Sequence, residues 1–227
     1  MRTLNVIRLQ MINRSTFLWT PLIILAGATL LSILIYAMIP VDTPKYGGAG
    51  QAPLWYFFAI GIGAMSYTFP FSQAMSITRR EFFFGTMLTA VIASALMGGL
   101  FVLGGGIELA TGGYGVNGYV FYLPWMWESG AFGAFLVFFT LSLLLFLLGF
   151  TGAAIYKSWG QTVLTIVWVG LALLFILLVF LATRFELWGA FWAGVGGLGA
   201  AGLAAWGLLV VAVLMLVSFF AFRRVTP

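Results

Sequence analysis

The sequence contains no cysteine and no histidine among its 227 residues. The lack of cysteine excludes disulfide bonds and thiol chemistry, and the lack of histidine excludes imidazole metal ligands and imidazole acid–base catalysis. Asp42 is the single aspartate, so a catalytic pair of aspartates is excluded as well. The chain also lacks the Gly-x-x-x-x-Gly-Lys-Ser/Thr loop that binds nucleotide phosphates. We therefore expect this chain not to be an enzyme by itself and to hold no cofactor.

Charged residues are scarce throughout the chain. They make up 7% of the sequence and hydrophobic residues 63%, whereas a soluble domain has about 25% charged residues. Long apolar runs separated by charge are typical of membrane-spanning helices, and a membrane barrel would instead show strands of alternating pattern. The net charge is +5, but no basic stripe indicates a nucleic-acid partner. The sequence predicts an all-α integral membrane protein surrounded by lipid.

Six apolar runs each reach about 20 residues, which is the length that crosses ~30 Å of hydrocarbon as a helix. The predicted spans are residues 17–39, 54–75, 82–103, 131–155, 163–183 and 203–222 of a single transmembrane domain, residues 1–227. Pro70 is expected to kink the second span near one end. Residues 1–16 carry three arginines and a moderate amphipathic pattern, which predicts an N-terminal interfacial helix; the alternative is a frayed polar tail.

The basic residues predict the orientation of the spans. If both termini are cytoplasmic, only Lys45 and Arg184 lie outside, and the other eight of the ten basic residues lie inside. Those eight are Arg2, Arg8, Arg14, Arg79, Arg80, Lys157, Arg223 and Arg224. The positive-inside rule therefore favours two cytoplasmic termini, with Lys157 in a tight turn between the fourth and fifth spans.

The stretch from residue 76 to residue 86 carries two adjacent arginines between two apolar runs. Thr78 and Glu81 have the Thr-x-x-Glu spacing of a capping box, in which each side chain bonds the other residue's backbone N–H. Two interpretations of Arg79 and Arg80 are open. They either anchor the protein at the membrane face or dock a cytoplasmic partner, whose carboxylates would suit their planar guanidinium groups.

Weakly polar and small residues within the spans are further candidates. Gln73, Ser72 and Tyr67 either line a transport pathway or form hydrogen bonds between helices. Small residues recur at every fourth position near the sixth span, which allows a neighbouring backbone to approach closely. These residues are Ala193, Gly197, Ala201 and Ala205. They pack either within the subunit or along the seam of a homodimer.

Four stretches carry a family resemblance: Phe69-Pro70-Phe71, residues 77–86, residues 110–116 and the terminal residues 223–227. Together with the six predicted spans and the inward N-terminus, they make the chain resemble the permease subunits of bacterial ABC exporters, the ABC type-2 permease class. The resemblance implies the ABC type-2 exporter permease fold and a place in the bacterial plasma membrane. The chain departs from the family at residues 184–202, where the family has outer gate helices and this sequence has a short Gly- and aromatic-rich connection that we expect to be helical in part.

The resemblance also implies partners. Such permeases form dimers with an identical or homologous second permease subunit, and each half docks one of two cytoplasmic ABC ATPase subunits that bind the ATP and Mg. A coupling helix between the second and third spans makes this contact. The residues that occupy its position here are Ser76, Thr78, Arg79, Arg80 and Glu81. The alternative function is that of a non-transporting structural or assembly subunit in another membrane complex.

Overall fold

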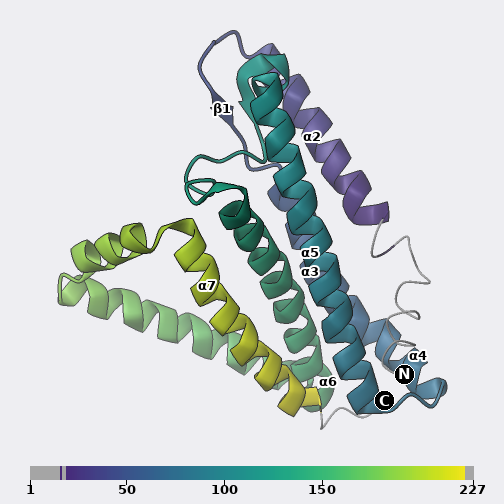
Figure 1. Ribbon diagram of the computed structural model, residues 1–227. Helices are drawn as coiled ribbons and strands as arrows, with labels where there is room; N and C mark the ends of the chain where they lie inside the picture. The colour runs from purple at the N-terminus through teal and green to yellow at the C-terminus, as the bar shows by residue number, and fades with distance from the viewer. Residues whose placement is uncertain (1–15, 17–18, 223–227) are drawn as a thin grey trace.

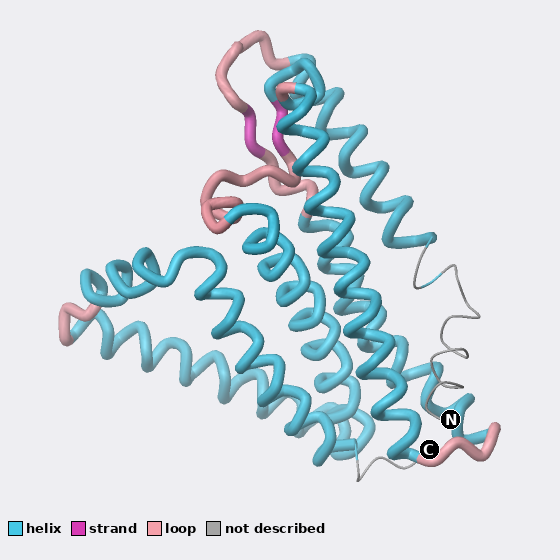
Figure 2. The backbone as a smooth tube through the Cα atoms, in the orientation of Figure 1, coloured by secondary structure: helices cyan, strands magenta, loops and turns pink. Residues whose placement is uncertain are grey.

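The computed structural model describes residue 16 and residues 19–222. The protein is a bundle of long helices with one very short pair of strands (Figures 1 and 2). The elements are α2 (Thr20–Met38), β1 (Lys45–Tyr46), α3 (Gln51–Gly63), η2 (Ala64–Thr68), α4 (Phe69–Ala74), α5 (Arg79–Thr111), η3 (Gly113–Asn117), β2 (Gly118–Tyr119), α6 (Gly130–Arg184) and α7 (Trp188–Phe222). The predicted interfacial helix lies outside the described residues except for Thr16, and Arg223 and Arg224 lie outside them too.

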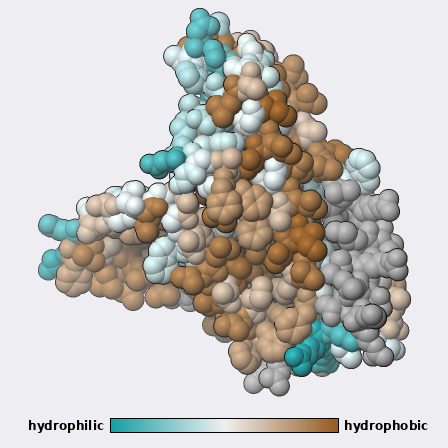
Figure 3. Space-filling view, viewed as in Figure 1, coloured by the Kyte–Doolittle hydropathy of each residue, from teal (hydrophilic) through white to brown (hydrophobic). Residues whose placement is uncertain are grey.

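The described part of the chain has five helices that are long and apolar enough to cross a membrane, which is the architecture of a multi-pass membrane protein. One of them is made of α3, η2 and α4 in succession. Hydrophobic residues cover most of the visible face, and hydrophilic residues gather at its extremities (Figure 3). This distribution fits an apolar slab between two aqueous layers.

The bundle has two distinct ends (Figure 1). The turn between α4 and α5 lies at one end together with the C-terminal end of α7, and we call it the basic end because Arg79 and Arg80 begin α5 there. At the other end β1 pairs in parallel with β2, Lys45 opposite Gly118 and Tyr46 opposite Tyr119. We call this the strand end.

The helices α3 and α6 make backbone contact at two glycines. A Cβ added at Gly149 would lie 3.0 Å from the carbonyl carbon and closer still to the carbonyl oxygen of Phe58, and one added at Gly61 would meet the backbone of Phe146 and Phe150. Small residues allow this approach between membrane helices, where van der Waals packing contributes much of the association energy. The pair Gly61 and Gly149 therefore fixes the point at which the two helices cross.

Two glycines with positive φ interrupt the last two helices. Gly160 (φ 83°, ψ 178°) breaks α6 and Gly199 (φ 62°, ψ −178°) breaks α7, in a region that L side chains rarely adopt. Between these breaks, residues 161–198 leave the bundle as a projecting arm with mostly exposed side chains (Figure 1). The predicted turn around Lys157 is thus a break at one residue, and the predicted connection 184–202 is helical from Trp188 onwards.

The boundaries of the second and third spans differ from the prediction. The second begins at Gln51 and passes through a π-helical segment, η2, just before Pro70. The third was predicted over residues 82–103, but α5 runs from Arg79 to Thr111. Residues 104–130, which lie between the predicted third and fourth spans, therefore begin with about two further turns of helix.

We expect Gly149→Ala to destabilise the bundle, because the added methyl group would meet the backbone of α3 at Phe58. The expected loss of free energy of unfolding is about 1–3 kcal/mol, as for other overpacked sites. Gly152, on the same helix, has nothing within 4 Å of an added Cβ, so Gly152→Ala is the matched control. Thermal unfolding in detergent measures both, and equal midpoints for the two variants would contradict the crossing.

Candidate functional site

The turn at the basic end is closed by the predicted capping box, which the structure confirms. Glu81 N donates to Thr78 Oγ1 at 3.3 Å, and Thr78 N donates to Glu81 Oε2 at 3.1 Å. The Thr78 hydroxyl also donates to the same carboxylate oxygen at 2.7 Å. This reciprocal arrangement satisfies backbone donors at the start of α5 and fixes the helix start at Arg79.

The two arginines lie in the first turn of α5. Arg79 is half-buried and Arg80 is exposed, with its guanidinium carbon 5.7 Å from the centre of the Phe84 ring. In the part of the chain from Phe69 to Thr111 no separate helix stands between α4 and α5, and residues 75–78 form a tight turn. The position that the resemblance gives to a coupling helix is thus occupied by a turn and the start of a long helix.

The three polar residues predicted near a pathway have different surroundings. Gln73 donates through Nε2 to the carbonyl of Ile77 at 3.0 Å, which ties the turn to α4. Ser72 is fully buried, and its hydroxyl donates to the carbonyl of Phe69 at 2.7 Å. Tyr67 is 79% exposed on the outside of the bundle. Gln73 Nε2 also donates to the Ser72 hydroxyl at 3.5 Å, so these two side chains lie together next to the turn, whereas Tyr67 does not join them.

Beneath the turn lies a cluster of buried phenylalanines that joins four helices. It consists of Phe69 on α4, Phe82 and Phe83 on α5, Phe150 on α6 and Phe222 on α7. Phe222 lies at the centre, with ring centroids 4.9 Å from Phe69, 5.9 Å from Phe82 and 5.9 Å from Phe83. Edge-to-face and offset pairs at such distances contribute about 0.5–1.5 kcal/mol each beyond area burial. The start of α5 is therefore firmly packed against the rest of the basic end.

A lysine from α6 compensates for the proline in the second span. In a regular α-helix the carbonyl of Ser66 would accept from the N–H of residue 70, but that residue is Pro70 and has no N–H. Lys157 Nζ instead donates to the Ser66 carbonyl at 3.3 Å. The neighbouring Ser158 hydroxyl donates to the carbonyl of Ala221 at 2.9 Å. The residues just before the Gly160 break thus tie α6 to both η2 and α7.

At the strand end, Glu108 on the last turns of α5 is fully buried. Its Oε1 accepts from Val120 N at 2.8 Å, and its Oε2 accepts from Phe121 N at 2.9 Å and Tyr122 N at 2.7 Å. Three backbone N–H groups are a strong set of partners for a buried carboxylate. Glu108 therefore holds the connection that follows β2 against the end of α5.

Two more groups contribute to the strand end. Burial, together with the charge of Glu108, raises the pKa of the Tyr114 phenol to about 12, so Tyr114 stays neutral at physiological pH. Lys45 donates to the carbonyls of Tyr36 and Ile39, both at 3.0 Å, and of Val116 at 3.2 Å. A cation at the C-terminal carbonyls of α2 is favoured by the helix dipole as well. Lys45, predicted to lie outside the membrane, closes α2 onto η3.

Sequence reasoning missed Glu108 because it placed the residue in a loop. The predicted third span ends at residue 103, and the three glycines that follow, Gly104 to Gly106, have low helix propensity although they continue α5. The signal that could have found the true end is Gly112, which follows Thr111 and adopts the left-handed C-cap conformation typical of glycine.

The predicted seam of small residues crosses a break. Ala193 and Gly197 precede Gly199 and lie exposed on the arm, whereas Ala201 and Ala205 follow it in the straight part of α7. The four residues therefore do not form one continuous helical face. Within the subunit, Ala200 and Ala204 of α7 are buried near Val137 of α6, and Ala221 is buried further along α7, where its carbonyl accepts from Ser158.

Comparison with protein-family models, with curated proteins and with solved structures finds no match to this chain. The function is therefore inferred from the geometry of the described residues. A capped basic turn stands at one end of α5, and an anchored carboxylate stands at the other.

We expect Lys157→Met to lower the free energy of unfolding by about 1–3 kcal/mol, because the half-buried Ser66 carbonyl loses its donor. Pro70→Ala restores an N–H at the α-helical partner position of that carbonyl, so it should reduce the cost of Lys157→Met. A double-mutant cycle followed by thermal unfolding in detergent measures this coupling. Strict additivity of the two substitutions would argue against the compensation.

We expect Glu108→Gln to loosen the strand end. The neutral amide presents one oxygen and one NH₂ group to three N–H donors, so at least one donor loses its acceptor, at a cost of about 1–3 kcal/mol. Hydrogen exchange at residues 120–122 should become faster. The control is Glu186→Gln at an exposed carboxylate, and similar exchange in both variants would refute the anchor.

Proposed function

We propose that this chain is the transmembrane permease subunit of an ATP-driven ABC exporter in the bacterial plasma membrane. Residues 76–86 would dock a separate cytoplasmic ATPase subunit. Two copies of that ATPase would bind ATP and Mg, and a second permease subunit, identical or homologous, would complete the translocation pathway. The resemblance in the sequence is one support for this proposal, and the construction of α5 is the other.

The observation that carries the proposal is that α5 joins the two ends of the protein. Its 33 residues span about 50 Å at 1.5 Å per residue. Its first turn holds the capped arginines and the buried Phe82 and Phe83, and its last turns hold Glu108. A partner that displaces the basic turn would therefore also displace the phenylalanine cluster and the connection anchored by Glu108. A subunit driven from outside the membrane needs such a mechanical link.

The six-span topology belongs to this proposal. Gly160 divides α6 into a part of 30 residues before it and a part of 24 residues after it, and each part exceeds the ~20 residues that a span needs. Counted as two spans, they bring the total from five to six, with both termini on the cytoplasmic side. The basic end, with Arg79, Arg80 and Lys157, would then face the cytoplasm as the positive-inside rule requires.

We expect the double variant Arg79→Glu, Arg80→Glu to fold normally but to lose coupled transport. Carboxylates at the turn would repel acidic residues of the ATPase, so co-purified ATPase should fall and remaining hydrolysis should no longer drive export. The matched control is Arg184→Glu, at the far end of α6. Native co-purification, ATPase activity and export from vesicles are the measurements.

One outcome would reverse the proposal, and another would correct the role of the arginines. If no ATPase subunit co-purifies with the wild-type chain, the function as a permease is wrong, and a structural or assembly subunit becomes the better description. If the ATPase co-purifies and the double variant transports normally, the permease function stands but the arginines are membrane-face anchors.

A further inference from the structure

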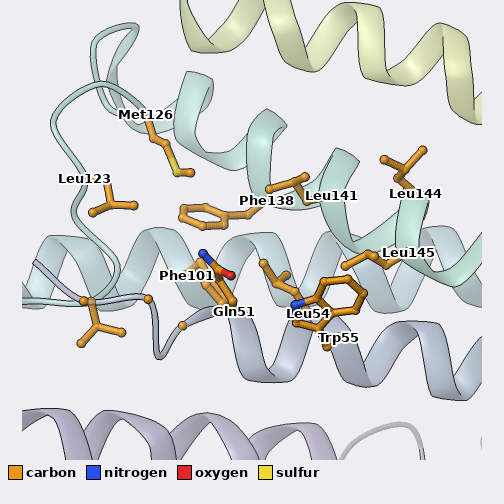
Figure 4. Close-up of a pocket in the computed structure, with 14 residues that line it drawn as sticks. Gln51, Leu54, Trp55, Phe101, Leu123, Met126, Phe138, Leu141, Leu144 and Leu145 are labelled. Atoms are coloured by element: carbon orange, nitrogen blue, oxygen red, sulfur yellow. The ribbon is translucent and has the colours of Figure 1, made fainter. Parts of the chain in front are cut away.

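A partly open apolar cavity of about 310 Å³ lies within the bundle toward the strand end (Figure 4). It lies between α3, α5 and α6 and beneath the connection that follows β2. Its lining consists of Gly47, Gly48, Gly50, Gln51, Leu54, Trp55, Phe101, Val120, Leu123, Met126, Phe138, Leu141, Leu144 and Leu145. The volume is at the lower end of the range of ~300–1,000 Å³ found for small-molecule sites.

The crossing of α3 and α6 explains why a cavity lies here. The two helices touch through their backbones at Gly61 and Gly149. About one to two turns closer to the strand end the facing residues are Leu54 on α3 and Leu141 and Leu145 on α6, and these line the cavity. The two helices are in contact at one depth and are held apart by larger side chains further along. A glycine-rich segment lies beside this gap, so a wedge of space remains between the helices.

The segment that covers the cavity is held in place by hydrogen bonds within the protein. Met126 N donates to the carbonyl of Leu123 at 2.9 Å, which closes a turn over the space. Glu108 holds the backbone of Val120, and Trp127 Nε1 donates to the carbonyl of Phe121 at 3.2 Å. A preformed site loses little conformational entropy when a ligand enters.

The chemistry of the lining indicates the class of ligand. Phe101 and Phe138, with ring centroids 4.4 Å apart, form one apolar wall, and leucines form much of the rest. The polar side-chain groups among the lining residues are the amide of Gln51 and the indole N–H of Trp55, both exposed in the first turns of α3. An apolar interior with a few polar groups at its entrance suits a chain with a polar end.

We propose that this cavity binds one acyl chain of a membrane phospholipid, with Gln51 and Trp55 at the end that carries the headgroup. The proposal does not depend on the proposed transport function. No charged side chain lines the cavity, and Lys45, which begins β1 close to the lining glycines, already donates to three carbonyls. Binding should therefore depend on the acyl chain and not on the charge of the headgroup.

The experiment uses the full chain in nanodiscs of phosphatidylethanolamine and phosphatidylglycerol. A small fraction of phosphatidylethanolamine carries a photoactivatable diazirine on one acyl chain, and mass spectrometry maps the adducts after irradiation. We expect adducts to be several-fold more abundant on residues 47–55, 120–126 and 138–145 than on residues 161–198. The arm is the internal reference because its apolar side chains are mostly exposed. The same probe on phosphatidylglycerol should give the same pattern.

Filling the cavity should remove this enrichment. In Leu141→Trp the larger side chain occupies the space, and cavity adducts should fall several-fold while arm adducts persist. Leu173→Trp, at an exposed position on the arm, is the matched control and should retain the cavity adducts. Because a tryptophan in the bundle can prevent folding, competition on the unmodified chain provides a second measurement. Unlabelled single-chain lysophospholipid should lower the cavity adducts and leave the arm adducts unchanged.

Adducts spread evenly over the cavity and the arm would overturn the proposal, since they would indicate only the annular lipid around every membrane protein. Enrichment at the cavity that survives competition would overturn it as well. A pattern that appears with one headgroup and not with the other would contradict recognition through the acyl chain.

Discussion

The backbone contact between α3 and α6 at Gly61 and Gly149 is the constraint on which the rest of the bundle depends. Membrane helices gain little from the hydrophobic effect when they associate, so close van der Waals contact must supply much of the energy. Two glycines at one depth let the backbones touch there and separate on either side. Toward the basic end the phenylalanine cluster fills the space, and toward the strand end the space remains as the cavity.

The helix α5 links these two regions, and both of its ends are closed by carboxylates. Glu81 completes the capping box at the basic end, and Glu108 binds three N–H groups at the strand end. Around the buried Glu108, each unsatisfied backbone group would cost several kcal/mol. Glu81 therefore caps the start of α5, and Glu108 determines which segment packs against its end. In the proposed function, a displacement of the basic turn would reach the strand end through α5.

The features that the sequence predicted are local, and those that it missed join distant parts of the chain. Thr78 and Glu81 were predictable because a capping box needs only a spacing of three residues. Apolar runs of about 20 residues likewise indicated membrane helices from composition alone. Glu108, by contrast, binds residues 12 to 14 positions away across a turn of unusual conformation, and Lys157 reaches Ser66 from 91 positions away. A hydropathy pattern carries no information about such partners.

Three charged residues bind backbone groups in irregular segments, and Arg80 differs from them. Lys157 donates to the Ser66 carbonyl, which has no N–H partner at Pro70, and Lys45 donates to a C-terminal carbonyl of α2. Glu108 accepts from the backbone N–H groups that follow β2. Each charge replaces a backbone partner that an irregular segment has lost. Arg80 is different: it is exposed, it follows a helix start that Thr78 and Glu81 already cap, and it lies over the ring of Phe84. The fold of the subunit accounts for these three charges but not for Arg80, which leaves two interpretations for Arg80, a membrane-face anchor or the proposed docking site.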